Sequence, residues 1–286
     1  MVNKRKHSVL WQITPPQGGK LSYLLGTVHL GAGFVLERLP RYRDLIRQCA
    51  AYAGETDVDA LTDSPVPAAM DSAYRDLYPR VLSGTQLRFL QRYLHPHFPF
   101  SEQWMSLHPV SLISVLSEIV LQAEGQPPLD KLLWDYAKSL GLPTFAVEPP
   151  QQQYALFADL DLDVSFKQLK RVVSGFDSFR KRMKKVARLY AEQDIFLLHR
   201  ILKRDLGKFR RTLLYARNDS MAESIAGLVT AQPTFVSIGA GHLAGGKGVL
   251  RLLKRKGFTV KPETSLNYTQ SDWSGDGKNI EQGTPI

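Results

Sequence analysis

The chain has 286 residues and a mass of 32.2 kDa, which is enough for one large domain or two small ones. Hydrophobic residues make up 43% of it and charged residues 22%, a globular composition that excludes collagen-like, low-complexity or disordered structure for most of the chain. The net charge is +10, and the single cysteine, Cys49, excludes an internal disulfide and a thiolate metal site.

The positive charge is concentrated in one region. Residues 165–217 contain 16 Lys or Arg and 4 acidic residues, a local charge of +12, whereas the remaining residues together carry −2. This region is predicted to be helical, and no aromatic residues alternate with its basic residues on the charged face. We therefore expect no nucleic-acid partner. A solvated helix face or a weak contact with an anionic surface remain as interpretations.

Hydropathy predicts where the chain resides. It contains no run of 18 apolar residues, and no apolar run of 7–15 residues follows the basic segment 1–7. We therefore expect neither a membrane span nor a signal peptide, and a cytoplasmic location.

The first predicted elements form a hairpin followed by a helix and a strand. Residues 9–14 and 21–25 are β-rich and enclose a Pro- and Gly-rich turn. A helix is predicted near residues 40–50 and a short buried strand at residues 51–55. This order predicts a right-handed βαβ unit with a parallel pair of strands.

The rest of the chain alternates helical regions with single strands. Helices are predicted for residues 63–141, 165–229 and 247–256, and strands for residues 142–148, 234–238 and 258–260. We expect one α/β domain over residues 8–262, in which helical insertions at about 63–141 and 165–229 interrupt a mixed, largely parallel central sheet. Residues 264–286 are polar and Gly-rich, and a disordered tail is expected there.

One motif occurs twice. Residues 26–33 (GTVHLGAG) and 239–246 (GAGHLAGG) both have the pattern Gly-x-x-His-Leu-x-x-Gly, and each follows a predicted strand and precedes a helix and another strand. In each copy the first glycine, Gly26 or Gly239, allows a tight backbone turn or the close approach of another segment. The repetition predicts two related βαβ halves about a pseudo-two-fold axis.

The repeated motif predicts a metal site. The carboxyl ends of parallel strands are where open α/β sheets bind ligands, so His29 and His242 are expected to converge there. Imidazole is the commonest metal ligand, and Glu55, which ends the 51–55 strand, is a candidate third ligand or general base. Such a donor set suits Zn, Mn, Co or Fe, and a bound ion would activate water for hydrolysis. A solvated loop is the alternative interpretation of Glu55.

Other polar residues have weaker signals. Glu148 ends a second strand and is a candidate general base, or a residue that contacts the metal ligands rather than the metal itself. His95 and His97 form a possible ligand pair, His108 is expected to be structural, and His199 is expected to lie at the surface of the basic helical region.

Several segments in this order resemble the TraB/GumN family, the bacterial relatives of the Tiki metalloproteases. The resemblance covers about residues 8–262. It rests on YLLGTVH at 23–29, LP at 39–40, ETD at 55–57, LD at 129–130 with Ala137, Glu148 and Gln152 after it, RN at 217–218 with Met221, and FVSIGAGHL at 235–243 with Gly248 and GF at 257–258.

The resemblance implies the fold of a wider superfamily that includes erythromycin esterases and ChaN haem-binding proteins. It also implies a metal-dependent peptide hydrolase that uses two Gly-x-x-His motifs and a glutamate. Arg217 and Asn218 become candidate substrate-binding residues, because an Arg fork can hold a carboxylate or an oxyanion and an amide can orient a carbonyl. Two other functions stay open: a non-catalytic haem or small-ligand binder of the same fold, and a basic scaffold for membranes or acidic partners.

Overall fold

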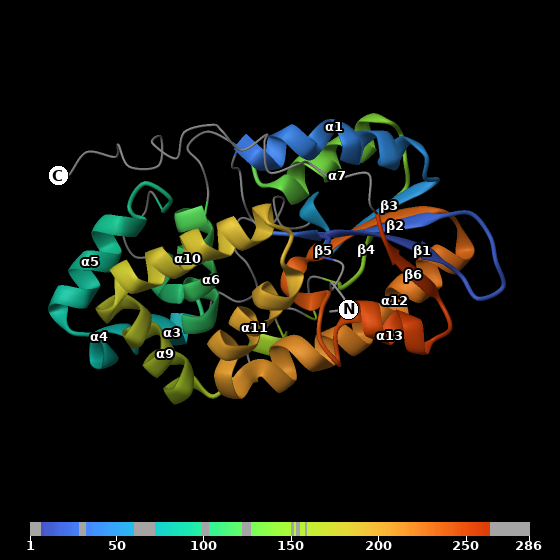
Figure 1. The fold of residues 1–286 in the computed structure, drawn as a ribbon. Coiled ribbons are helices and arrows are strands. Elements are labelled where there is room, and N and C mark those ends of the chain that lie inside the picture. Colours follow the sequence, from blue (N-terminus) through green and yellow to red (C-terminus); the bar gives the residue numbers. More distant parts are fainter. Residues whose placement is uncertain are drawn as a thin grey trace.

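The computed structural model describes residues 7–28, 33–59, 72–98, 103–121, 127–149, 152, 155–157 and 159–263 (Figure 1). In these ranges the strands are β1 (Leu10–Thr14), β2 (Ser22–Thr27), β3 (Ala51–Gly54), β4 (Thr144–Ala146), β5 (Thr234–Gly239) and β6 (Thr259–Pro262). The helices are α1 (Gly33–Arg47), α3 (Ser72–Arg75), α4 (Tyr78–Val81), α5 (Gly84–Leu94), α6 (Pro109–Leu121), α7 (Leu129–Ser139), α9 (Leu162–Ser174), α10 (Phe176–Ala191), α11 (Ile195–Leu206), α12 (Arg217–Ala231) and α13 (Val249–Arg255). Short 3₁₀ turns are η1 (Gln103–Ser106), η2 (Gly207–Phe209) and η4 (Ala240–His242), and η3 (Arg211–Ala216) is a π-helical segment.

The strands form one mixed sheet in the order β4-β3-β5-β2-β1-β6. Strands β4, β3, β5 and β2 are parallel, whereas β1 pairs antiparallel with both β2 and β6. The central strands β2 and β5 are buried along almost their whole length, which is typical of parallel strands covered on both faces. The predicted α/β class, with a largely parallel sheet, is confirmed, and so is the predicted hairpin, formed by β1 and β2.

The two connections that follow the motif strands, from β2 to β3 and from β5 to β6, each pass over strands that lie between their ends. Strands β2 and β3 are parallel, as the βαβ prediction requires, but they are not neighbours, because β5 lies between them. In the second half, the chain leaves β5 through α13 and reaches β6 beyond β2 and β1. The connection from β2 to β3 therefore passes over β5, and the connection from β5 to β6 passes over β2 and β1. This interleaving brings the two motif-bearing strands, β2 and β5, side by side.

Element boundaries differ from the predictions mainly at helix starts. The helix predicted near residues 40–50 begins at Gly33, and Pro40 lies inside it, on the exposed side. A proline inside a helix removes one backbone hydrogen bond, but the apolar side chains of Leu39, Tyr42 and Leu45 are buried on the opposite side and hold the helix against the sheet. Packing thus outweighs the local signal for a helix start at proline.

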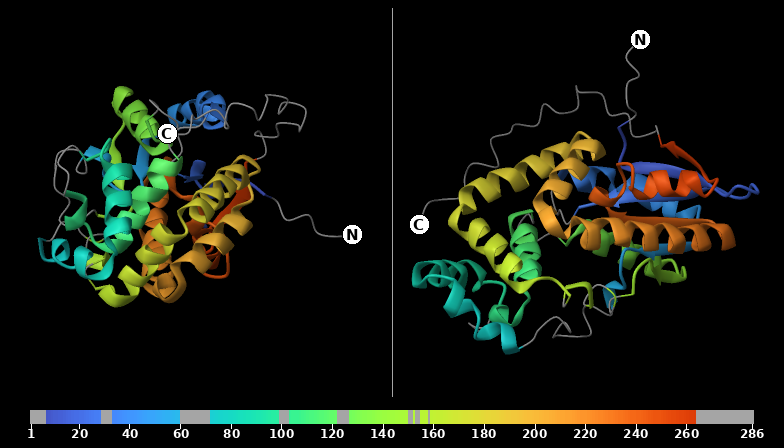
Figure 2. Two further views of the ribbon diagram at one scale, coloured as in Figure 1. Left: turned by 90° about the vertical axis from the view of Figure 1, so that its left-hand side faces the viewer. Right: turned by 90° about the horizontal axis from the view of Figure 1, so that it is seen from below.

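Helices cover both faces of the sheet and also form a separate lobe. Helices α1 and α7 lie on one face and α12 and α13 on the other (Figure 1), and α12 runs along the underside of the sheet in Figure 2. Helices α3 to α6, α9 and most of α10 form the lobe beside the sheet. Buried apolar residues form one large cluster around the sheet, a second cluster in the lobe and a small third cluster that comprises Val110, Leu160, Phe209 and Leu213. The described parts of both predicted insertions are helical.

The basic stretch on α10 largely faces water. Arg180, Lys181, Lys184 and Lys185 are exposed, opposite the buried Phe179 and Met183 side chains. Arg182 is an exception to the solvated helix face considered for this basic region. It is half-buried and pairs with Asp205 of α11 at 3.1 Å, because its position on the helix turns it toward that neighbour. The contact of this face with anionic surfaces stays a prediction.

Two expectations concern residues beyond the described ranges. The predicted tail, residues 264–286, and His29 both lie outside them. Among the described residues, no helix has the length and apolar character needed to span a bilayer.

Candidate metal centre at the carboxyl edge of the sheet

Four parallel strands end at the same edge of the sheet, and the candidate residues follow directly. Glu55 is the first residue after β3, Glu148 follows β4, and His242 follows β5. Backbone pairing continues past the strands: Glu148 donates its N–H to the carbonyl of Glu55 at 2.9 Å. Two carboxylates are therefore placed side by side by main-chain geometry alone.

The glycine that ends β5 holds the Glu55 carboxylate. The backbone N–H of Gly239 donates to Oε2 of Glu55 at 2.6 Å. A Cβ atom added at Gly239 would lie 3.2 Å from Oε2 of Glu55 and 3.4 Å from Cδ2 of His242. Both side chains therefore meet around this glycine. Any larger residue would intrude between them.

The glycine of the first motif serves a close approach as well. A Cβ atom on Gly26 would lie 2.5 Å from Cδ1 of Leu243 and 2.9 Å from Cα of Ala240. Gly26 lies within β2 and Gly239 ends β5, and neither has a positive φ. Of the two roles considered for these glycines, the structure selects close packing of β2 against the turn after β5.

Arg217 joins the two carboxylates. Its Nη2 donates to Oε1 of Glu55 at 2.6 Å and to Oε2 of Glu148 at 2.5 Å, and its Nε donates to Oε2 of Glu148 at 3.0 Å. Only 15% of the Arg217 side chain and 2% of the Glu148 side chain are exposed. Three candidate polar residues, Glu55, Glu148 and Arg217, are thus committed to one internal ion cluster, in which a single guanidinium pairs with two carboxylates.

This network fixes the charge state of Glu55. Burial by itself would raise the pKa of the Glu55 carboxyl, but the Arg217 charge, His242 and the Gly239 N–H outweigh burial and lower the pKa to about 2. The same carboxylates raise the pKa of Arg217, although burial opposes this. At neutral pH the Glu55–Arg217 pair is therefore fully ionised.

A chain of hydrogen bonds fixes the tautomer of His242. The Asn218 amide nitrogen donates to the carbonyl of Lys247 at 2.7 Å, so its oxygen must be the acceptor toward Nδ1 of His242, 2.6 Å away. Nδ1 then carries the proton. Burial is the main reason that the pKa of His242 falls to about 4, and the charge of Arg217 adds to it. At neutral pH the ring is neutral, and its Nε2 lone pair faces away from Asn218.

This donor set suits a metal ion. A metal-bound imidazole typically donates its other ring N–H to an oxygen acceptor, as His242 does to Asn218. The ionised Glu55 places a carboxylate beside it, which is a type of group that also binds metals. Across the described ranges no group of three or more His, Cys, Asp or Glu side chains is arranged to hold a metal, and the third predicted ligand, His29, lies outside them.

The structure brings Glu55, Glu148, Arg217, Asn218 and His242 together. Arg217 and Asn218 make the internal contacts described above, and their substrate-binding role stays a prediction.

His199 was expected at the surface, and this expectation is wrong. It is half-buried on α11, its Nδ1 lies 3.0 Å from the carbonyl oxygen of Gly241, and its ring packs against Gly245. Its charge would also lower the pKa of His242, so the two rings are neighbours. The sequence held a signal for this position: His199 follows Ile195 and Leu198 and precedes Leu202 at the spacing of the buried helix face.

Three other histidines, His95, His97 and His108, lie on helices or loops away from the strand ends. His95 and His97 are exposed at the end of α5. His108 is buried between the rings of Tyr74 and Phe157, in agreement with the structural role expected for it.

A cavity of about 530 Å³ adjoins the motif turns. It lies among α6, α9, α10 and α11, and Val28 and Gly241 line it where it reaches the sheet edge. Most of its wall is apolar; the polar and charged lining residues are Ser114, Ser117, Gln168, Arg171, Arg182, Arg204 and Asp205. A volume of this size is typical of small-molecule and peptide side-chain sites.

Comparisons with known proteins point to one family. The profile of the TraB/PrgY/gumN family matches residues 9–262. Metalloprotease TIKI2 of Danio rerio is 23% identical over an alignment of 332 residues, which covers 95% of this chain and 64% of the relative. Metalloprotease TIKI1 of Homo sapiens is 23% identical over 321 residues, covering 89% and 62%. The chain thus spans less than two thirds of these curated relatives. No solved structure matches significantly.

Proposed function

Because the chain belongs to the TraB/PrgY/gumN family, we propose that it is a metal-dependent hydrolase that acts on peptides or related amides. His29, His242 and Glu55 would be the ligands of a divalent ion. When bound, the ion would lower the pKa of a water molecule and polarise the scissile carbonyl.

The observation that carries the proposal is the hydrogen-bonded chain from Lys247 through Asn218 to His242. It leaves the unprotonated Nε2 of a neutral imidazole beside an ionised carboxylate, which is the state that metal binding requires.

The charge states favour distinct roles for the two acids. A general base works best with a pKa near the operating pH, whereas the pKa of Glu55 is about 2. Glu55 is therefore better suited as a ligand than as a base. Glu148 is held by Arg217, and in the proposed site it positions this arginine against Glu55.

The apolar cavity supports a substrate with an apolar segment. Because it adjoins Val28 and Gly241 at the end of the motif strands, a side chain bound there would place its neighbouring amide near the sheet edge. The same cavity favours the alternative function, in which haem or another small ligand binds without turnover.

The test combines metal content with cleavage. The purified full chain is stripped of metal, reloaded separately with Zn, Mn, Co or Fe, and tested on a peptide library. We expect metal-dependent cleavage that His242→Ala abolishes together with metal binding. The matched control is His95→Ala, an exposed histidine remote from the site. A haem absorption band without cleavage would support the alternative, and full cleavage without metal would contradict the proposal.

A further inference from the structure

A second hollow, distinct from the cavity beside the motif turns, is strongly basic. It has a volume of about 670 Å³ and is lined by Gly207, Lys208, Arg210, Arg211, Tyr215 and Lys247. We call it the basic hollow. Its described lining includes no acidic residue and no aliphatic residue such as Leu, Ile or Val.

Segments distant in sequence build the basic hollow. Arg211 and Tyr215 belong to the π-helical segment η3, and such irregular turns are often associated with functional sites. Lys247 comes from the loop after His242, and its Nζ lies 5.2 Å from the centre of the Tyr215 ring. The backbone carbonyl of Lys247 also accepts the Asn218 amide, so the loop is anchored next to the candidate metal centre.

The four cations in this hollow are not neutralised. Lys208, Arg210, Arg211 and Lys247 are all exposed, and none forms an ion pair with a carboxylate in the part of the chain that the structure describes. Arg182 and Arg217, by contrast, each have an acidic partner. Four like charges around one hollow repel each other and produce a positive potential that an anion would relieve.

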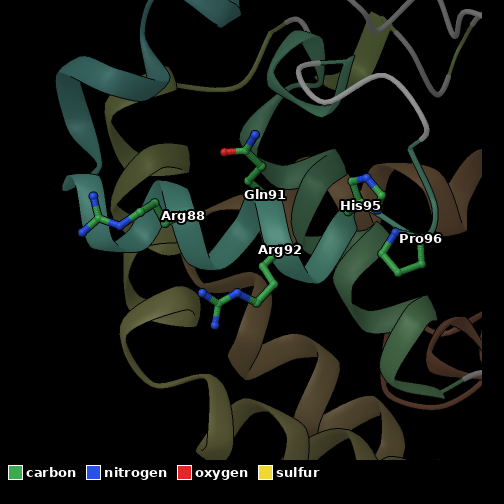
Figure 3. Close-up of a pocket in the computed structure, with 5 residues that line it drawn as sticks. All are labelled: Arg88, Gln91, Arg92, His95 and Pro96. Atoms are coloured by element: carbon green, nitrogen blue, oxygen red, sulfur yellow. The ribbon is translucent and has the colours of Figure 1, made fainter. Parts of the chain in front are cut away.

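Another basic hollow serves as a comparison. Arg88, Gln91, Arg92, His95 and Pro96 line a hollow along α5. Figure 3 shows that the Arg88 and Arg92 side chains extend away from His95 and Pro96. All these residues come from one helix and its end, so no second segment closes around a ligand.

We propose that the basic hollow binds a small molecule carrying two or more phosphate groups. Arginine forks match phosphate oxygens in bidentate geometry, and lysine adds a point charge. A volume of about 670 Å³ is in the range of small-ligand sites and exceeds what a single phosphate fills. Tyr215 offers a ring face beside the charges, which a nucleoside base could use. This inference is independent of the hydrolase proposal.

The test measures binding of inorganic pyrophosphate and of ATP to the full chain by isothermal titration calorimetry, without added metal. We expect both to bind, with affinity falling as salt rises from about 0.05 to 0.5 M because screening weakens the attraction. Arg210→Gln combined with Arg211→Gln should weaken binding about tenfold or more, since charge-assisted bonds are lost. Tighter binding of ATP than of pyrophosphate would assign the Tyr215 ring to a base.

The matched control removes two charges elsewhere. Arg88→Gln combined with Arg92→Gln, on the α5 hollow of Figure 3, should leave affinity within about twofold. Lys247→Gln gives a second, single-charge variant in case the double change perturbs folding, which circular dichroism would reveal. An equal loss in the control, or no binding by the unchanged chain, would overturn the proposal.

Discussion

At the scale of single residues, one guanidinium determines the electrostatics of the candidate site. Arg217 lies between Glu55 and Glu148 and contacts both. Breaking a buried pair is far more costly than never having formed it, because the remaining charge stays buried without a partner. Removing Arg217 would leave two carboxylates, Glu55 and Glu148, without their cationic partner.

We therefore expect Arg217→Gln to destabilise the fold by about 3–5 kcal/mol. Adding Glu148→Gln removes one of the stranded charges and should restore about 1–3 kcal/mol of this loss. Urea denaturation at neutral pH measures both. The exposed Arg180→Gln serves as the control and should change stability little. A double variant no more stable than Arg217→Gln would show that charge is not the cause.

Buried histidine makes stability depend on pH. His108 is 1% exposed, its Nδ1 accepts the backbone N–H of Val110 at 3.3 Å, and its Nε2 has no hydrogen-bond partner among the described residues. Burial lowers the pKa of His108 from 6.5 to about 4. The unfolded chain therefore takes up the proton first as the pH falls. The stabilising effect is fully present above about pH 6.5 and is lost progressively toward pH 4.

We expect the free energy of unfolding to fall between pH 6.5 and pH 4, with His108 contributing at most about 1.4 kcal/mol per pH unit. His108→Gln should flatten this slope, whatever it does to stability at pH 7, whereas the exposed His97→Gln should not. Urea denaturation across this pH range gives the slope. An unchanged slope in His108→Gln would assign the acid sensitivity to other groups, of which His242 is the first candidate.

At the scale of secondary-structure elements, the site depends on where helices pack rather than on where they begin. Asp161 caps α9 and Asp194 caps α11 through side-chain bonds to backbone N–H groups, so these starts are local. The cavity among α6, α9, α10 and α11 is not local, because each helix contributes only part of its wall.

Filling this cavity should block ligand entry without disturbing the sheet edge. Ser117 lines the cavity from α6, and its hydroxyl donates to the carbonyl of Ile113 at 2.8 Å. We expect Ser117→Trp to lower the affinity for an apolar fluorescent dye about tenfold while metal content stays unchanged. Ser139→Trp on α7 is the matched control, since the Ser139 hydroxyl also bonds a carbonyl of its own helix but lies outside the cavity. Equal dye binding by both variants would place the dye elsewhere.

At the scale of the whole molecule, α10 connects the two larger hydrophobic clusters. Its Phe179 and Met183 belong to the cluster of the helical lobe, whereas its Leu189 and Tyr190 belong to the cluster around the sheet. The Tyr190 hydroxyl also donates to the carbonyl of Gly26 at 2.9 Å, which ties the helix to the first motif. We propose on this ground that the chain forms a single domain.

A single domain should unfold in one cooperative transition. We expect calorimetry to give equal calorimetric and van't Hoff enthalpies. Leu169→Ala, which truncates a buried leucine in the lobe, should lower the midpoint of that same transition, at a cost of about 2–5 kcal/mol. Two transitions, with only one of them shifted by Leu169→Ala, would instead show that the lobe folds separately from the sheet.

Local patterns were enough to predict much of the fold. Strands and helices could be read from apolar periodicity, and the repeated Gly-x-x-His motif indicated two strand ends at one edge of a parallel sheet. That Glu55 and His242 meet there follows from the general rule that parallel strands end together. The start of α1 was the main local error, because burial of Leu39, Tyr42 and Leu45 outweighs the signal of Pro40.

Only the tertiary structure decided which side chains of the site pair with one another. Charge and type alone do not reveal that Arg217 pairs with Glu55 and Glu148, because these residues lie 162 and 69 positions away along the chain. Local patterns likewise do not reveal that Asn218 sets the tautomer of His242. Nor do they reveal that His199 packs against the turn after β5, where its Nδ1 lies near the carbonyl oxygen of Gly241. Sequence determines which side chains can bond and which helix face is buried. Partners, pKa values and cavities arise from distances between segments that local patterns do not encode, so they are settled only when the elements pack.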